Sequence, residues 1–378
     1  MNDIPAAEPA AQAEITDQVR TLEFTGSARE YFRIWIVNLF LSAVTLGLYS
    51  PWAKVRKKRY LYGNTWLAGA NFEYHGNPVA ILKGRLIAVA ALIAYNVAGH
   101  YIPKLGTAVL LVLMIAAPWL IVRSFQFNAE NSTYRNVRFH FHGRYAEGLR
   151  AIAPLLLTPI LVLLLPTVDP AHIPSGSEIW MLFVPSLPIL LFYPYVMGAI
   201  KRMHVGNSAF GAAPFSFSAR IRSFYGIYFL AMLVFVGWMM LVGMVVAATI
   251  AIPGAAWVTG PLGYLFAISL FFGYTRARVV NITFNHAAIG EGLWFVSTLK
   301  AMKLGWIYFG NLVAIVVSCG LLVPWAVVRT TRYRASSLRV ECPQGLEAFL
   351  ATVVALEGRA VGATGEQMGE FFDVDLSL

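Results

Sequence analysis

Residues 38–60 read NLFLSAVTLGLYSPWAKVRKKRY, and residues 311–333 read NLVAIVVSCGLLVPWAVVRTTRY. The two segments align without a gap at a constant offset of 273 residues, and 12 of the 23 positions are identical. The identical residues include Asn, Gly, Pro, Trp and two Arg, so a shared aliphatic composition does not explain the match. The chain therefore carries two copies of one element, and self-similarity of this kind is typical of a fold built from repeats.

Each copy combines an apolar run with helix breakers and a basic end. Gly47 and Pro51 interrupt the first run, and Gly320 and Pro324 interrupt the second, at positions where a helix can turn. A continuous helix over residues 28–61 would be about 51 Å long. Two crossings of a membrane core of roughly 30 Å need more than this length. We therefore predict that each copy forms a re-entrant hairpin that enters and leaves by one face of a membrane.

The composition of the chain indicates a membrane protein. Of its 378 residues, 58% are hydrophobic and 13% are charged, whereas soluble domains carry about 25% charged residues. Six further apolar runs are long enough to span a bilayer: residues 81–101, 105–122, 151–168, 179–200, 224–252 and 257–274. We predict six crossings. The alternative is eight plain crossings, with residues 34–53 and 304–328 also spanning.

Positive charge is concentrated between these runs. Five stretches hold 24 of the 29 Lys and Arg residues: 54–85, 123–150, 201–222, 276–303 and 329–339. The connectors at the other ends of the runs are nearly free of Lys and Arg. Short loops rich in Lys and Arg stay in the cytoplasm, so we expect all five stretches and both termini to lie inside.

Short alternating segments follow the basic helix ends. Residues 71–76, 138–143 and 214–217 alternate aromatic and other residues, and Asn and Gly bound most of them. A period of two predicts short strands, and because single hairpins are marginally stable, we expect four or five to join into one sheet. The predicted fold is an all-α polytopic membrane protein with small cytoplasmic β hairpins, built from internal repeats of helix–hairpin–helix units.

The two ends of the chain differ from this pattern. Residues 1–19 are rich in Ala and contain two prolines, so we expect a disordered cytoplasmic tail. Residues 20–340 form the predicted membrane domain. Residues 341–378 form an acidic cytoplasmic tail, with a short amphipathic helix over 345–357 where four apolar residues have helical spacing. We expect the acidic end to dock on the basic loops; a free solvated tail is the alternative.

Five stretches of the sequence resemble the YjgN-like family of bacterial inner-membrane proteins. They are Phe24-Thr25-Gly26, YFRIWIVN at 31–38, TLGLYSPWAKVR at 45–56, YGNT at 62–65 and the acidic GEQMGEFFDVDL at 365–376. The resemblance covers nearly the whole chain from about residue 19. It implies a bacterial source and the cytoplasmic membrane, and it brings no catalytic residues.

The sequence carries no sign of an enzyme. Ionisable residues inside a membrane mark ion paths, but apart from Lys83 and Arg85, near the start of run 81–101, the six central runs contain no Asp, Glu, Lys or Arg. Phosphate loops, zinc-protease helices and nucleophile elbows are absent from the sequence, and the histidines and two cysteines lack metal-ligand spacing. We expect no cofactor, no metal and no nucleic-acid partner, because a membrane already accounts for the positive charge.

The candidate site residues belong to the two repeated elements: Arg56, Arg59, Arg329, Arg332, Asn38, Asn311, Trp52 and Trp325. Clusters of basic residues beside helix ends bind anionic lipid head groups, so we expect the protein to bind or move an anionic lipid or amphiphile. Alternatively, the arginines only anchor the topology and the asparagines only bond neighbouring helices. The rival function is a membrane scaffold that recruits a cytoplasmic protein partner, and homo-oligomerisation remains open.

Overall fold

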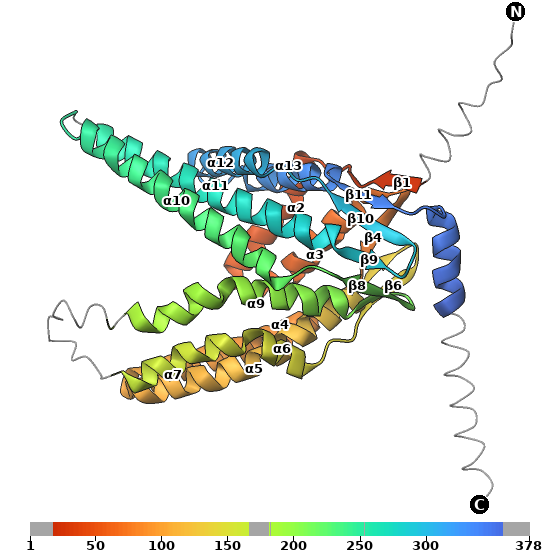
Figure 1. Ribbon diagram of the computed structural model, residues 1–378, viewed down its shortest axis with the longest axis horizontal. Coiled ribbons are helices and arrows are strands. Elements are labelled where there is room, and N and C mark those ends of the chain that lie inside the picture. Colours follow the sequence, from red (N-terminus) through yellow and green to blue (C-terminus); the bar gives the residue numbers. More distant parts are fainter. Residues whose placement is uncertain (1–17, 166–180, 182, 253, 358–378) are drawn as a thin grey trace, which may run out of the picture.

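The long helices and the strands occupy opposite ends of the molecule (Figure 1). The computed structural model describes residues 18–165, 181, 183–252 and 254–357. The predicted terminal tails therefore lie outside the described residues, except for residues 18–19 and 341–357. Both ends of the described chain lie at the strand end of the molecule.

Six segments of the described chain are long and apolar enough to cross a membrane, as the apolar runs predicted. They are α4 (Pro78–Tyr101), α5 (Pro103–Glu130), α6 (Tyr145–Ile152) continued by η1 (Ala153–Leu156) and α7 (Leu157–Leu164), η2 (Val184–Ser186) with α9 (Leu187–Gly206), α10 (Ile221–Thr249) and α11 (Ala255–Asn285). Their outward side chains are apolar: Phe229 and Met244 on α10 expose 73% and 70% of their surface. Such continuous apolar exposure indicates a lipid environment.

Glycines allow two pairs of helices to touch closely. A Cβ added to Gly273 of α11 would lie 2.4 Å from Cα of Gly305, which belongs to α12 (Ala301–Val317). In the same way, a Cβ on Gly106 of α5 would lie 2.5 Å from Cα of Gly99 on α4. Small residues at crossings let helix backbones approach in membranes, so these glycines determine how the helices are packed.

The two repeated segments form two short helical hairpins of the same geometry. The first is α2 (Ala28–Val44) with α3 (Ser50–Gly63), and the second is α12 with α13 (Val323–Ser336). The turns match at the backbone: φ is 89° at Gly47 and 91° at Gly320, and 48° at the preceding residue in both copies. With 17 residues, α2 is about 25 Å long, which is shorter than a membrane core of roughly 30 Å.

Hydrogen bonds repeat between the copies as well. The Tyr60 hydroxyl accepts from the amide of Ser27 at 2.8 Å, and the Tyr333 hydroxyl accepts from the amide of Lys300 at 3.0 Å. Each tyrosine thus joins the end of its helical hairpin to the start of the same hairpin. Figure 1 shows the two copies next to each other, and α2 packs against α13.

A short β hairpin follows each of the first four pairs of helices, and the single strand β11 (Leu338–Glu341) follows the last pair. The hairpins are β3 (Thr65–Leu67) with β4 (Ala70–Tyr74), β5 (Ser132–Tyr134) with β6 (Val137–Phe141), β7 (Ser208–Phe210) with β8 (Ala213–Phe217), and β9 (Ala287–Ile289) with β10 (Leu293–Ser297). They join edge to edge in one antiparallel sheet, in the order β1-β11-β10-β9-β8-β7-β6-β5-β4-β3-β2. This confirms that the predicted hairpins form a single sheet.

The sheet closes into a ring through the two ends of the chain. The strands at its two edges are β1 (Val19–Thr21), which pairs with β11 (Leu338–Glu341), and β2 (Glu23–Phe24), which pairs with β3. Only Leu22 separates β1 from β2, and its amide donates to the carbonyl of Leu338 at 3.1 Å. One extended segment therefore bridges the two edges of the sheet, and the strands form a ring, which we call the barrel.

Five equivalent hydrogen bonds link neighbouring units around this ring. In each, the amide just beyond a strand donates to the carbonyl of the residue that ends a helix of the next unit. The pairs are Thr25 to Asn64, His75 to Asn131, His142 to Asn207, Ser218 to His286 and Thr298 to Ser337, at 2.8–3.0 Å. Asn64, Asn131 and Asn207 are the acceptors in three of these joints between units, and His286 and Ser337 are the acceptors in the other two.

Candidate functional site

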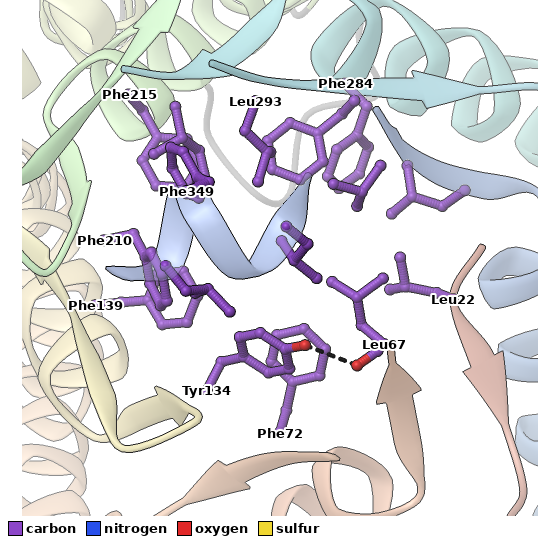
Figure 2. A pocket seen from close by; sticks show the side chains of 16 residues that line it. Leu22, Leu67, Phe72, Tyr134, Phe139, Phe210, Phe215, Phe284, Leu293 and Phe349 are labelled. Carbon is purple, nitrogen blue, oxygen red and sulfur yellow. Dashed lines mark hydrogen bonds between the residues drawn. The ribbon is translucent and has the colours of Figure 1, made fainter. Parts of the chain in front are cut away.

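The barrel encloses an apolar lumen. A cavity of about 270 Å³ lies inside the ring, and Figure 2 shows side chains from successive hairpins pointing into it. The aromatic rings contact one another around the wall: Phe72 stacks on Tyr134 with centroids 4.8 Å apart, and Phe139 lies 4.9 Å from Phe210. The Tyr134 hydroxyl is the one polar side-chain group among the wall residues, and it donates to the Leu67 carbonyl at 2.7 Å.

A helix closes the far end of the lumen. Residues 346–357 are helical and lie across the end of the sheet (Figure 1). Phe349 and Val353 expose only 4% and 1% of their surface, because this face of the helix packs into the barrel. The opposite face, with Thr352 and Val354, is exposed.

A second cavity adjoins the lumen on the side of the helices. Its volume is about 670 Å³, and we call it the chamber. Six side chains belong to the walls of both cavities: Leu22, Phe72, Phe139, Phe215, Phe284 and Phe295. The chamber and the lumen are therefore consecutive parts of one internal space, which runs from the helix ends into the barrel.

The wall of the chamber is strongly basic. Lys58 of α3, Lys201 of α9, Arg276 of α11 and Arg334 of α13 all line it. No Asp or Glu of the described chain belongs to this wall. Four helices thus direct positive charge into one cavity, where Lys58, Lys201 and Arg334 are half-buried and Arg276 is exposed. Burial of a charge without an opposite charge is costly.

Lys58 shows the effect of this burial. Its ammonium contacts Oδ1 of Asn128 on α5 and lies 4.5 Å from the centre of the Tyr74 ring. Burial, together with the smaller effect of the positive charge of Lys54, lowers the pKa of Lys58 to about 8. The ammonium is therefore still largely protonated at pH 7, but it has lost much of its hydration.

Arg334 has a like-charged neighbour. Burial lowers the pKa of its guanidinium, and the positive charge of Arg276 adds to the fall. An anion placed between the two guanidinium groups would relieve both effects, because an opposite charge stabilises the charged form. Arginine also presents a planar fork of donors that fits phosphate and carboxylate oxygens. The chamber is therefore chemically suited to an anionic group.

Aromatic and small polar side chains complete the wall. The imidazole of His204 stacks on Phe125, with centroids 4.0 Å apart and an interplanar angle of 10°. The hydroxyls of Ser132 and Ser208 donate to carbonyls of their own preceding helices, at 2.7 and 2.6 Å. Perturbed titratable groups that converge in a cavity are typical of functional sites.

The predicted site residues lie outside the wall of the chamber. In the second copy, Arg329 donates to Oδ1 of Asn311 at 3.3 Å, and its guanidinium lies 5.0 Å from the Trp325 ring. Asn311 donates to Oγ1 of Thr330 at 2.9 Å. Arg332 donates to the Gly26 carbonyl at 3.0 Å. The second copy thus brings Asn311, Arg329 and Trp325 together, within the helical hairpin.

The first copy is arranged differently in detail. Asn38 is buried, and its Oδ1 has no hydrogen-bond partner among the described residues. Trp52 stacks on Tyr49 at 5.9 Å, and the guanidinium of Arg56 lies 5.9 Å from the same ring. Arg59 donates to the Tyr74 carbonyl at 3.3 Å. Arg56 and Arg59 are exposed, so they face the surroundings of the protein.

The candidate site residues drawn from the sequence do not include the four basic residues of the chamber. All four lie in the predicted basic stretches, but those stretches also contain exposed residues. One signal was available: Lys58 and Lys201 each stand six residues before the asparagine that ends the helix, Asn64 or Asn207. An alignment of the helix ends would have placed these two lysines in equivalent positions.

The comparisons with known proteins agree with this architecture. The chain is 25% identical over 348 residues to the inner membrane protein YjgN of Salmonella typhimurium, which covers 85% of this chain and 88% of that protein. It is 31% identical over 121 residues to inner membrane protein YjgN of Escherichia coli K12, covering 32% of this chain and 30% of that protein. No solved structure matches the chain. Residues 19–371 match the family described as bacterial protein of unknown function, DUF898, and the chain therefore belongs to this family.

Proposed function

We propose that this multi-pass protein of the bacterial inner membrane binds an anionic lipid or amphiphile in the chamber, without catalysing a reaction. The observation that carries the proposal is the convergence of Lys58, Lys201, Arg276 and Arg334 in one wall that contains no acidic residue of the described chain. A bound anionic group would supply the missing opposite charge. Phosphate and carboxylate groups match the donors available.

The membrane setting supports a lipid-like ligand. Six helical segments of the described chain are long and apolar enough to cross a membrane, and the relatives are named inner membrane proteins. The barrel and both described ends of the chain lie at one end of the molecule. We assign this end to the cytoplasm, because the basic stretches of the chain are gathered there and positive residues are retained inside.

The outer basic residues have a separate role in the proposal. Arg56, Arg59, Arg329 and Arg332 lie on the two helical hairpins, which also carry Trp52 and Trp325. Arginine and tryptophan are enriched where a membrane meets water. We assign this outer cluster to contacts with lipid head groups around the protein, and the chamber to the specific ligand.

Two matched variants test the proposal. The chamber variant carries Lys58→Gln, Lys201→Gln, Arg276→Gln and Arg334→Gln, and the outer variant carries Arg56→Gln, Arg59→Gln, Arg329→Gln and Arg332→Gln. Each removes four positive charges. Native mass spectrometry of protein purified from the membrane should show retained anionic lipid on the wild type and the outer variant, and a loss of about tenfold or more on the chamber variant.

The opposite pattern would overturn the proposal. If the chamber variant retains as much anionic lipid as the wild type, the ligand does not bind between these four cations. Loss confined to the outer variant would assign the lipid to the re-entrant hairpins. Both variants are compared with the wild type at equal monodispersity, so that a folding defect is recognised before lipid is counted.

A further inference from the structure

We propose that the aromatic lumen is the alkyl subsite of the same ligand, so that the ligand is a single-chain amphiphile with a compact anionic head. The head would bind in the chamber, and the chain would point through the barrel towards helix 346–357. This inference rests on the proposed function, and it adds the shape of the ligand and the direction in which it binds.

The chemistry of the lumen selects an alkyl chain. The interiors of proteins are close-packed, with few voids larger than a water molecule, whereas this cavity measures about 270 Å³. Its wall is built from aliphatic and aromatic side chains, and the Tyr134 hydroxyl is already bonded to the Leu67 carbonyl. Water needs several polar partners inside a protein, and apolar cavities instead take up apolar molecules. The lumen therefore favours hydrocarbon over water.

The order of the two cavities sets the direction of binding. The four cations line the chamber, and none of them lines the lumen. Phe72, Phe139 and Phe215 line both cavities, so the wall changes from basic to aromatic along one path. A ligand whose head contacts Lys201 or Arg276 can thus place its chain directly among the phenylalanine rings.

The lumen holds one chain and has a fixed depth. The strands around it are hydrogen-bonded into a closed ring, so a chain cannot leave sideways. Phe349, Leu350 and Val353 of helix 346–357 close the far end. The Glu347 carboxylate accepts from Arg135 at 2.6 Å, which fastens this helix to the ring. A ligand chain longer than the lumen would collide with the helix, so affinity should stop rising at a definite chain length.

The test uses inorganic phosphate and alkyl phosphates of four, eight, ten and twelve carbons as probes. Binding is measured by calorimetry on the full chain in nanodiscs of zwitterionic phosphatidylcholine. Burial of each methylene is worth about fourfold in affinity, so affinity for the wild type should rise steeply with chain length and then level off. Partition of the probes into the nanodisc is the same for every variant and is subtracted with protein-free discs.

Three variants show whether the chain enters the lumen. Leu293→Trp adds volume inside the ring, since Leu293 is buried and lines the lumen; the affinity should level off at a shorter chain. Phe349→Ala removes a side chain at the far end of the lumen and so lengthens the cavity, and the affinity should level off at a longer chain. Val296→Phe adds volume at a neighbouring strand position outside the lumen wall, and the dependence on chain length should stay as in the wild type.

The outcomes separate this inference from the proposed function. Unchanged binding of inorganic phosphate in the three variants shows that the chamber is folded and intact. If phosphate binds but the dependence on chain length is identical in the wild type, Leu293→Trp and Phe349→Ala, the chain does not enter the lumen and the inference is wrong. The proposal that the chamber binds an anionic group is not affected by this result. If neither inorganic phosphate nor any alkyl phosphate binds to the wild type, both proposals are wrong.

Discussion

The Arg135 guanidinium donates through Nη1 to both carboxylate oxygens of Glu347, at 2.6 and 2.7 Å. Its Nη2 also donates to the Ala68 carbonyl at 2.8 Å. Arg135 lies in the turn between β5 and β6, and Ala68 in the turn between β3 and β4. The hydrogen bond with Glu347 raises the pKa of Arg135, so the guanidinium is always charged. One side chain thus joins helix 346–357 to two neighbouring hairpins.

Removal of the Glu347 charge should loosen this helix only slightly. The side chain of Glu347 is 69% exposed, and exposed ion pairs contribute about 1 kcal/mol or less. In Glu347→Gln, amide hydrogen exchange of residues 346–357 should accelerate up to about fivefold. Glu291→Gln, in the exposed turn between β9 and β10, is the control. Exchange at the wild-type rate in Glu347→Gln would show that the pair does not hold the helix.

A charge on the buried face of the helix should release it. Val353 is 1% exposed, and an unpaired carboxylate at such a position is costly to bury. Val353→Asp should therefore speed maleimide modification of Cys342, which is 2% exposed, by about tenfold or more in a Cys319→Ser background. The control is Thr352→Asp, which places the same charge on the exposed face.

Modification of Cys342 at equal rates in these two variants would contradict the packing described for helix 346–357. The comparison is internal, because the two substitutions differ by one position and introduce the same side chain. It is also independent of any ligand.

The sequence predicts much of this architecture for local reasons. Six apolar runs are long enough to be recognised one by one, and Gly47 and Gly320 occupy positive-φ positions that favour glycine. The closure of the barrel is different, because it joins residues 19–24 to residues 338–341 across most of the chain. Residues 22–26 read LEFTG, in which apolar and polar side chains alternate as in a strand, but this local pattern does not show which strand is the partner.

The crossing of α11 and α12 should tolerate no added methyl group. A Cβ on Gly273 would overlap Cα of Gly305, at 2.4 Å. Gly273→Ala should therefore destabilise the protein, by roughly 1–3 kcal/mol for overpacking, with a lower thermal midpoint in detergent. Gly243→Ala on α10 meets nothing within 4 Å, and it should be neutral or stabilising by up to about 1 kcal/mol, since alanine favours helix.

Equal thermal midpoints for Gly273→Ala and Gly243→Ala would show that α11 and α12 are not in contact at these glycines. Both substitutions add one methyl group to an apolar helix. The difference between them thus reports the crossing alone.

Binding of an anion should weaken as pH rises from 7 to 9. The pKa of Lys58 is about 8, so its ammonium loses a proton across this window and the chamber loses one positive charge. Affinity for inorganic phosphate, corrected for the charge of phosphate itself, should fall several-fold in the wild type. Lys58→Arg keeps its charge and should show a flatter profile. The other titratable side chains of the chamber wall are common to both proteins: Tyr62, Lys201, His204, Arg276 and Arg334.

The stability of the folded protein should rise with pH, whereas the affinity for phosphate falls, and the rise should occur at a higher pH. The folded-state pKa of Lys58 lies below its ordinary value of 10.5, so between about pH 8 and pH 10.5 the unfolded chain binds more protons than the folded chain. Stability without ligand therefore gains from Lys58 as pH rises through this window, and Lys58→Arg lacks this gain. Identical pH profiles of phosphate affinity in the two proteins would contradict the burial of Lys58.

The chamber is harder to predict from the sequence than the helices that build it. In a soluble helix an apolar stripe shows which face is buried. In α9 and α11 both the lipid-facing and the inward-facing sides are apolar, so the sequence does not fix the rotation of the helix. Arg276 and Arg278 are both arginines and stand two residues apart on α11, but only Arg276 lines the chamber. The packing of neighbouring helices, not the local pattern, makes that choice.

The most direct test of the account is photolabelling with a dodecyl phosphate that carries a diazirine at the end of its chain. If the head binds among Lys201, Arg276 and Arg334 and the chain fills the barrel, the label should attach to helix 346–357 and to barrel residues such as Leu293. Excess inorganic phosphate should reduce this labelling. Attachment confined to the exposed apolar surfaces of α4 and α10, with no labelled peptide from residues 346–357, would contradict the account.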